Sequence, residues 1–237
     1  MKISINRDDI SCIFWSKVGR SMLRDFQLQS DALTRAAREA DSLRPFAAYN
    51  TGSVSIATML LIAEIAKLSA PRVVAEVGTF IGNTTTALGH GLQRALECSV
   101  DESERFIFSC DYSNDIKLPW GLRPVLVQFP LTKSVDMFNE LERRDISVDL
   151  FLIDGRLSGK DLDLVSSLAS NDAVILLDDF VGIEKGVVNA QLLLGQNRFA
   201  GHTLIYPPKS NDVPYLDLVG CSLAILVPQS TFMFTRQ

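Results

Sequence analysis

From residue 71 onwards, short β-branched apolar runs alternate with stretches of helical periodicity, and this alternation constrains the fold more than any other feature. Runs that are apolar on both faces are typical of parallel strands buried between two layers of helices. The sequence therefore predicts an α/β, Rossmann-like, doubly wound sheet, mostly parallel, with helices on both faces. Seven strands are expected, at Arg72–Val77, Arg105–Asp111, Pro124–Phe129, Asp149–Asp154, Ala173–Asp178, His202–Tyr206 and Ser222–Val227.

Helical periodicity fills most of the intervals between these strands and also precedes the first of them. The division that follows is an N-terminal helical extension over residues 1–50 and a main domain over residues 51–237. The expected helices are Asp31–Leu43, Val54–Leu68, Asn83–Ala95, Ser134–Arg143, Gly159–Leu168 and Lys185–Leu194, with a less regular pattern near Asn114.

Charge and hydropathy exclude several classes of function. The net charge is −5 and the basic residues are scattered, which argues against a nucleic-acid-binding surface. The most apolar stretch, Ala57–Ala70, carries Glu64 and Lys67 and is too short to span a membrane. The first fifteen residues lack the apolar segment of a signal peptide, and the four cysteines form no CxxC pair. A cytoplasmic protein with reduced thiols is expected.

The run Val-Ala-Glu-Val-Gly-Thr-Phe-Ile-Gly at residues 74–82 ends a strand with an acid and two glycines. In such sheets ligands bind beyond the carboxyl ends of the strands, where glycine permits a tight turn and a close approach of the backbone. A dinucleotide site would show G-x-G-x-x-G, whereas Glu76, Gly78 and Gly82 form E-x-G-x-x-x-G. The acid favours a cationic ligand over a diphosphate, although a turn without a ligand is the alternative.

The segment VVAEVGTFIGNTTTAL resembles the first motif of class I S-adenosylmethionine-dependent methyltransferases. The resemblance implies S-adenosylmethionine (SAM) as cofactor, with the glycine loop against its methionine part. It also implies that the acid at the end of the second strand accepts the ribose hydroxyls, that Phe129 packs against adenine, and that the loop before the first helix of the main domain closes over the amino-acid end. A turn cap, a core aromatic residue and a helix cap are the respective alternatives. The expected cofactor-binding residues are Thr51, Gly52, Ser53, Glu76, Gly78, Thr79, Gly82, Thr84, Asp111, Tyr112, Phe129 and Asp154.

Acidic residues end the fourth and fifth strands, at Asp154 and at Asp178-Asp179. Neighbouring parallel strands bring them to one edge of the sheet, where they repel unless protonated or bound to a cation. Hard oxygen ligands suit Mg²⁺, Ca²⁺ or Mn²⁺. The pattern resembles the metal-dependent O-methyltransferases of the catechol and macrocin types, which implies that Asp154, Asp178 and Asp179 hold Mg²⁺ and that the metal chelates the acceptor hydroxyls. The alternative is that these acids cap loops and face solvent.

The general base is the least defined part of the predicted site. Catechol-type enzymes have a lysine three residues after the strand-four aspartate, and this chain has Leu157 there. The catalytic candidates are Asp154, Lys160 and His202, and Lys185 either flanks the site or lies in solvent.

The resemblance predicts a divalent-metal-dependent O-methyltransferase that acts on a hydroxyl of a small molecule, either a specialised metabolite or a sugar. Residues 1–50 are expected to line the acceptor pocket or to form a homodimer contact. Two alternatives stay open: a metal-independent N- or O-methyltransferase, and a cofactor-binding or regulatory protein without transfer activity.

Overall fold

The computed structural model describes residues 7–47, 52–112, 116, 118–119 and 121–229. It contains a seven-stranded sheet in the order β3-β2-β1-β4-β5-β7-β6. Only β7 runs antiparallel to its neighbours; the other paired strands are parallel. The predicted doubly wound sheet is confirmed. Its strands are β1 Val73–Val77, β2 Phe106–Asp111, β3 Val125–Pro130, β4 Val148–Ile153, β5 Ala169–Leu177, β6 His202–Ile205 and β7 Ala224–Pro228.

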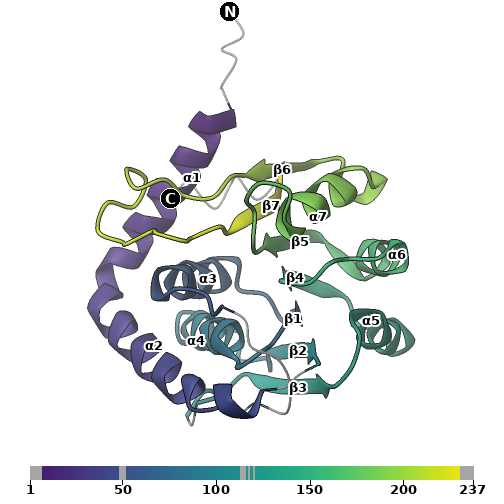
Figure 1. Ribbon diagram of the computed structural model, residues 1–237, viewed down its shortest axis with the longest axis horizontal. Coiled ribbons are helices and arrows are strands. Elements are labelled where there is room, and N and C mark those ends of the chain that lie inside the picture. The colour runs from purple at the N-terminus through teal and green to yellow at the C-terminus, as the bar shows by residue number, and fades with distance from the viewer. Residues whose placement is uncertain (1–6, 48–51, 113–115, 117, 120, 230–237) are drawn as a thin grey trace, which may run out of the picture.

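Helices cover both faces of the sheet (Figure 1). One face carries α3 and α4, with α1 and α2 wrapped around the outside of that layer, and the other face carries α5, α6 and α7. The α-helices are α1 Arg7–Met22, α2 Phe26–Asp41, α3 Ile56–Ser69, α4 Asn83–Glu97, α5 Ser134–Arg143, α6 Gly159–Leu168 and α7 Lys185–Leu194. Short 3₁₀ helices are η1 Leu23–Asp25, η2 Arg44–Phe46 and η3 Asn197–Phe199.

The central strands have two buried faces, which explains why most of their residues are apolar. Side chains along a strand point alternately to opposite sides of the sheet. Val74 and Leu152 belong to the core under α3 and α4, whereas their neighbours Ala75 and Ile153 belong to the core under α5 and α6. A polar residue that follows the last residue of such a strand lies at the carboxyl edge of the sheet.

The N-terminal helices share the first of these cores. Trp15, Val18 and Met22 recur at the spacing of one helix face, and their side chains are buried against the residues of α3. Trp15 Nε1 also donates a hydrogen bond of 2.5 Å to the carbonyl of Tyr206. The sequence did not predict α1 as a helix, and α2 begins at Phe26 rather than at Asp31.

Two further expectations concern the middle of the chain. Strand β5 begins at Ala169 rather than at Ala173, because Ala169 already pairs with Val148 of β4, and the register shifts before the pairing resumes at Val174. The helical pattern expected near Asn114 falls largely on residues outside the described ranges. No helix in the part of the chain that the structure describes is both long and apolar enough to cross a lipid bilayer.

Candidate functional site

The glycine loop between β1 and α4 folds around backbone conformations that favour glycine. Gly78 has φ +97° and Gly82, the N-cap of α4, has φ +87°. A Cβ atom on Gly78 would lie 3.1 Å from Cβ of Asp154, so the bare backbone lets the loop lie directly against the end of β4. Phe80, between the two glycines, also adopts a left-handed φ of +48°. Backbone strain of this kind is concentrated at functional sites.

The acid of the motif does not face the open edge, which corrects the expected role of Glu76 as a ligand-facing carboxylate. Its side chain is completely buried, and its two oxygens accept hydrogen bonds of 2.6 Å from the hydroxyls of Thr84, Thr85 and Ser109. Ser109 lies opposite Glu76 in the pairing of β1 with β2. Burial raises the pKa of Glu76, and the hydroxyl donors oppose that rise. Glu76 therefore ties α4 and β2 to β1.

The acid at the end of β2 also supports the glycine loop. Asp111 is 7% exposed, and its Oδ2 accepts a hydrogen bond of 2.7 Å from the backbone N–H of Phe80. The hydroxyls of Thr79 and Ser109 are hydrogen-bonded to each other one layer deeper. The next residue, Tyr112, is 57% exposed. Asp111 thus lies at the carboxyl edge of the sheet, where the sequence placed it.

Three carboxylates follow the neighbouring strands β4 and β5. The N–H of Asp154 donates to the carbonyl of Val77, and that of Asp178 donates to the carbonyl of Ile153, which continues the sheet pairing to its edge. Burial raises the pKa of Asp154 to about 7, the Asp178 carboxylate adds to the rise, and Lys185 opposes it. Burial also raises the pKa of Asp178. The third acid, Asp179, has a left-handed φ of +53°.

A lysine meets these acids from α7. Nζ of Lys185 lies 2.7 Å from Oδ1 of Asp154 and 3.0 Å from Oδ2 of Asp179. Partial burial lowers the pKa of Lys185, but its hydrogen bonds and charge interactions with the two carboxylates outweigh that effect and raise it. The ammonium therefore bridges the ends of β4 and β5.

Gly186 is the reason that α7 can begin so close to these acids. A Cβ atom at this position would lie 2.2 Å from the carbonyl oxygen of Asp178 and 2.8 Å from the backbone nitrogen of Phe180. Any side chain would push the first turn of α7 away from the end of β5. The dipeptide Lys185-Gly186 thus places the ammonium through a backbone contact.

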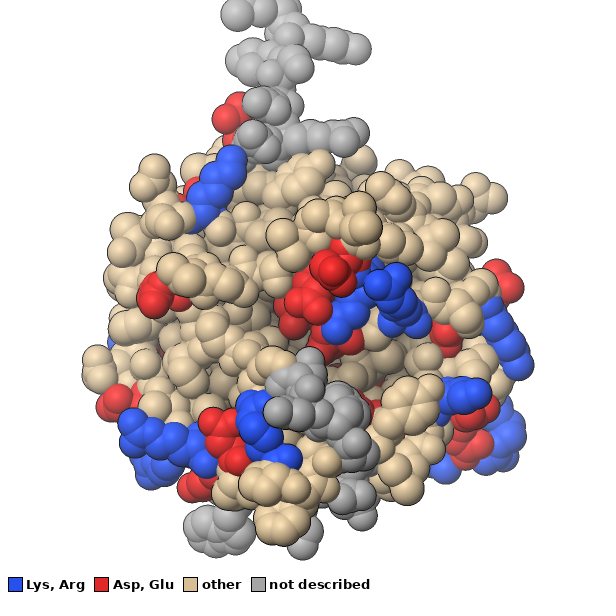
Figure 2. All heavy atoms as spheres, viewed as in Figure 1, with Lys and Arg blue, Asp and Glu red and all other residues tan. Residues whose placement is uncertain are grey.

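A cavity of about 570 Å³ opens between the glycine loop, these carboxylates and the segments before α3 and β7. Figure 2 shows acidic side chains beside basic ones near the middle of the face in view. Small polar side chains and three carboxylates dominate the walls. The lining residues are Gly52, Ser53, Val54, Ser55, Thr58, Gly78, Thr79, Phe80, Ile81, Asn83, Thr84, Asp154, Asp178, Asp179, Lys185, Val219, Gly220 and Ser222.

The structure brings together part of the predicted site and leaves the rest outside the cavity wall. Thr51 lies outside the described residues. The predicted residues on the wall are Gly52, Ser53, Gly78, Thr79, Thr84, Asp154, Asp178 and Asp179. Those not on it are Glu76, Gly82, Asp111, Tyr112, Phe129, Lys160 and His202.

Two of the three catalytic candidates, Lys160 and His202, do not line the cavity. His202 begins β6, and its Nε2 lies 3.1 Å from the carbonyl of Ala173, close to the amino end of the sheet. Lys160 lies in the first turn of α6 and is exposed to solvent. Neither residue lines the cavity, because His202 lies at the amino edge of the sheet and the side chain of Lys160 is exposed to solvent, and their catalytic role stays a prediction. Phe129 is half-buried against the core under α5.

Several wall residues were not singled out from the sequence. Asn83 is 7% exposed, and its Oδ1 has no hydrogen-bond partner among the described residues, although it lines the cavity. Ser222, just before β7, lies 3.4 Å from Oδ1 of Asp178. Lys185 was considered only as a flanking or solvated lysine. The one sequence signal for these residues is their position next to a strand or helix end.

The predicted metal site has the right atoms but the wrong arrangement. Carboxylate oxygens suit Mg²⁺. However, the ammonium of Lys185 already contacts Asp154 and Asp179, and a divalent ion on the same oxygens would bring two cations into contact. Within the described ranges, no group of three or more His, Cys, Asp or Glu residues is arranged to hold a metal ion. As arranged, these residues do not fit the predicted Mg²⁺.

No protein-family model matches the chain, and no curated protein matches it. Solved structures do share its fold. The O-methyltransferase TomG from Streptomyces achromogenes, involved in tomaymycin synthesis and crystallised with SAM, aligns with a TM-score of 0.55 and 16% identity over 83% of this chain and 88% of its own.

An O-methyltransferase from Bacillus cereus in complex with S-adenosylhomocysteine (SAH) aligns with a TM-score of 0.52 and 12% identity, over 85% of this chain and 90% of that one. The cofactor-bound protein Rv0187 from MTB aligns with a TM-score of 0.57 and 17% identity, over 95% and 99%. The chain therefore has the fold of these proteins, and the predicted class I methyltransferase fold is confirmed.

Proposed function

We propose that this protein is a SAM-dependent methyltransferase and that the cavity is its transfer site. One observation carries the proposal: in a fold shared with the TomG and Bacillus cereus O-methyltransferases, the cavity lies between the glycine loop at Gly78 and the acids at the ends of β4 and β5. Ligands of doubly wound sheets bind at this edge. The TomG and Bacillus cereus proteins of the same fold are complexed with SAM and SAH.

The charge of the cavity supports a cationic cofactor. SAM carries a sulfonium and an ammonium group, and the walls hold three carboxylates against the single ammonium of Lys185. We place the methionine end of SAM along Gly78, Thr79 and Asn83, where the unpartnered Oδ1 of Asn83 can accept a hydrogen bond from the ligand. Asp111 stays the proposed partner of the ribose. The support for this role is its position at the carboxyl edge of the sheet.

The proposed acceptor is a hydroxyl of a small molecule. In the transfer the bond between sulfur and methyl breaks, the bond between the acceptor oxygen and methyl forms, and the electron pair returns to sulfur to give SAH. The acceptor also loses its proton, and Asp154 is the catalytic candidate that remains on the cavity wall. Much of the rate enhancement in such a displacement comes from holding the two reactants in line.

Dependence on Mg²⁺ remains the prediction from the resemblance to metal-dependent enzymes. A specific observation favours the metal-independent alternative instead: the contacts of Lys185 with Asp154 and Asp179. Nitrogen acceptors belong to that alternative as well, since an amine needs no metal to raise its nucleophilicity.

The experiment that tests the proposal is a transfer assay with SAM carrying a labelled methyl group. The purified protein is incubated with a panel of hydroxylated and amino small molecules, and labelled products are identified by mass spectrometry. We expect labelled product on a hydroxyl compound and its loss in Asp154→Ala. SAM binding without transfer to any acceptor would instead support a cofactor-binding protein without activity.

A further inference from the structure

The ammonium of Lys185 holds the position that a divalent metal would need in this site. It lies within hydrogen-bond distance of one carboxylate after β4 and one after β5, which are the same acids expected to coordinate the metal. The side chain of Lys185 is 25% exposed, and that of Asp154 is 26% exposed, so the pair is largely shielded from solvent. Opposite charges interact more strongly there than at an open surface.

The position of the ammonium is built into the backbone. Lys185 is the first residue of α7, and Gly186 lets that turn lie against the carbonyl of Asp178. The left-handed conformation of Asp179 turns the chain directly after β5 and presents its carboxylate to the same ammonium. A solvated lysine that merely reached a nearby acid would need neither of these features.

An ammonium group has three N–H donors, and the two carboxylates account for two of them. No third partner for Lys185 lies among the residues that the structure describes. Since Lys185 lines the cavity, the remaining donor can reach a ligand there.

We propose that Lys185 is the resident cation of this site: its ammonium takes the place of a divalent metal, offsets part of the negative charge of Asp154 and Asp179, and donates a hydrogen bond to the acceptor oxygen. The role towards the acceptor rests on the proposed methyltransferase function. The exclusion of a divalent ion does not, because it depends only on the charges present.

The test is a Mn²⁺ titration followed by electron paramagnetic resonance of the free ion, without SAM or acceptor. The variants are Lys185→Met, which keeps an unbranched stem without charge, and Lys133→Met as control, since Lys133 is exposed before α5. We expect the wild type and the control to bind Mn²⁺ with a Kd above about 1 mM. Lys185→Met should bind it about tenfold or more tightly, because the repelling charge is gone.

Adding Asp179→Asn to Lys185→Met should abolish the gained binding. That result would show that the ion uses the carboxylates that Lys185 contacts in the wild type. Micromolar Mn²⁺ binding by the wild type, or no gain in a folded Lys185→Met variant, would overturn the proposal. If the variant fails to fold, which circular dichroism shows, tight Mn²⁺ binding by the wild type would still overturn the proposal.

A separate calorimetric titration of SAM distinguishes the two proposals. If SAM does not bind, the proposed function fails while the Mn²⁺ result still stands. If SAM binds and an acceptor is found, turnover should be unaffected by EDTA and reduced in Lys185→Met. Loss of turnover in EDTA that Mg²⁺ restores would overturn the role of Lys185.

Discussion

At the scale of single residues, the carboxylate of Glu76 accepts three side-chain hydrogen bonds and is buried behind the cavity wall. Glu76 accepts hydrogen bonds from hydroxyls on two other elements, and its complete burial makes each of these bonds expensive to lose. The glycine loop that follows it is held in place by Asp111 and Phe80. The shape of the cavity thus depends on buried acids behind its wall as well as on those that line it.

Replacing Glu76 by alanine should lower the free energy of unfolding by about 3 kcal/mol, because three buried hydroxyls lose their acceptor. Glu76→Gln keeps the shape and one acceptor oxygen, and should lower it by about 1 kcal/mol. Urea denaturation measures both. The matched control is Glu97→Ala, at the exposed end of α4, with an expected change below about 0.5 kcal/mol. Equal effects at the two positions would contradict the supporting role.

The pH dependence of stability reports on the same residue. Burial raises the pKa of Glu76 in the folded state, so between the ordinary and the raised pKa the folded protein binds more protons than the unfolded chain. The contribution of Glu76 to the free energy of unfolding should therefore fall as the pH rises through that interval. The difference between wild type and Glu76→Gln, measured by urea denaturation at several pH values above about 4.5, should shift in favour of the variant. A difference independent of pH would contradict the raised pKa.

At the scale of elements, the start of α7 decides the chemistry of the cavity. Its first turn touches the backbone at the end of β5, and only glycine at position 186 allows that distance. The contact carries Lys185 to acids on two different strands. A small movement of α7 would therefore change the net charge of the proposed transfer site.

Gly186→Ala should separate the first turn of α7 from Asp178 and lower the free energy of unfolding by about 2 kcal/mol through overpacking. Because Lys185 moves with that turn, the variant should also gain some of the Mn²⁺ binding expected of Lys185→Met. Gly159→Ala is the matched control, since it lies in the first turn of α6 and a Cβ atom there meets open space. If Gly186→Ala were as stable as this control, the close contact would be of no consequence.

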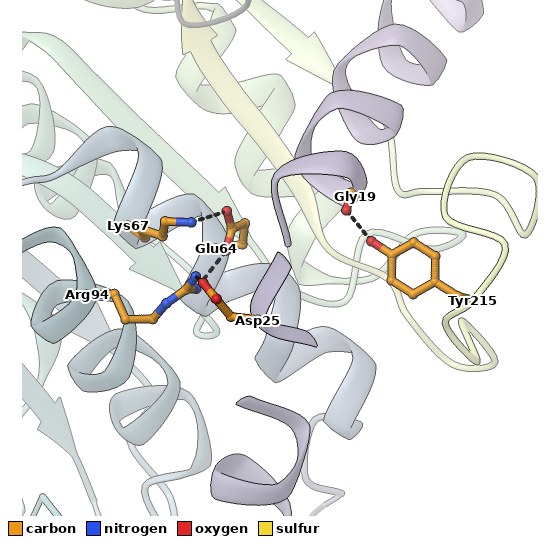
Figure 3. A network of polar contacts seen from close by, with 6 residues as sticks. All are labelled: Gly19, Asp25, Glu64, Lys67, Arg94 and Tyr215. Carbon is orange, nitrogen blue, oxygen red and sulfur yellow. Dashed lines mark hydrogen bonds and ion pairs between the residues drawn. The ribbon is translucent and has the colours of Figure 1, made fainter. Parts of the chain in front are cut away.

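At the scale of the whole molecule, the N-terminal helices are joined to the main domain by one core and by a buried charge network. Glu64 on α3 is fully buried, and it pairs with Lys67 and with Arg94 on α4 at 3.0 and 2.8 Å (Figure 3). Arg94 also contacts Asp25 of η1 at 2.7 Å. The hydroxyl of Tyr215, in the segment before β7, donates to the carbonyl of Gly19 on α1, which adds a second link.

Removing the central acid of this network should destabilise the entire protein. Glu64→Gln leaves the buried guanidinium of Arg94 without its main partner, and we expect a loss of about 3 kcal/mol. Asp25→Asn should cost less than about 1 kcal/mol, since the Asp25 side chain is 41% exposed. In both variants circular dichroism and the fluorescence of Trp15, with Trp120→Phe to isolate it, should report one coincident urea transition. Separate transitions would show that the N-terminal helices fold independently.

Much of the fold was predictable, because strands buried on two faces are mostly apolar, and the apolar runs of β1, β4 and β5 show that pattern. The acids that follow these strands were predictable for the same reason, since parallel strands share one carboxyl edge. The orientation of Glu76 was not, although the threonines at 84 and 85 and the buried Ser109 are its signal. Gly186 was missed and Lys185 was considered only as a flanking or solvated lysine, because their role depends on where α7 begins relative to β5, which no local pattern encodes. The homodimer stays a prediction, which light scattering can test.

A calorimetric titration of SAM into the wild-type protein tests directly whether the protein binds the proposed cofactor. We predict saturable one-site binding in the micromolar range. We also predict weaker binding by Asn83→Leu, which removes the unpartnered oxygen from the cavity wall, and unchanged binding by Asn171→Leu, an exposed asparagine near the amino end of β5. Absence of any binding heat in a folded wild-type protein would contradict the proposal that the cavity binds SAM.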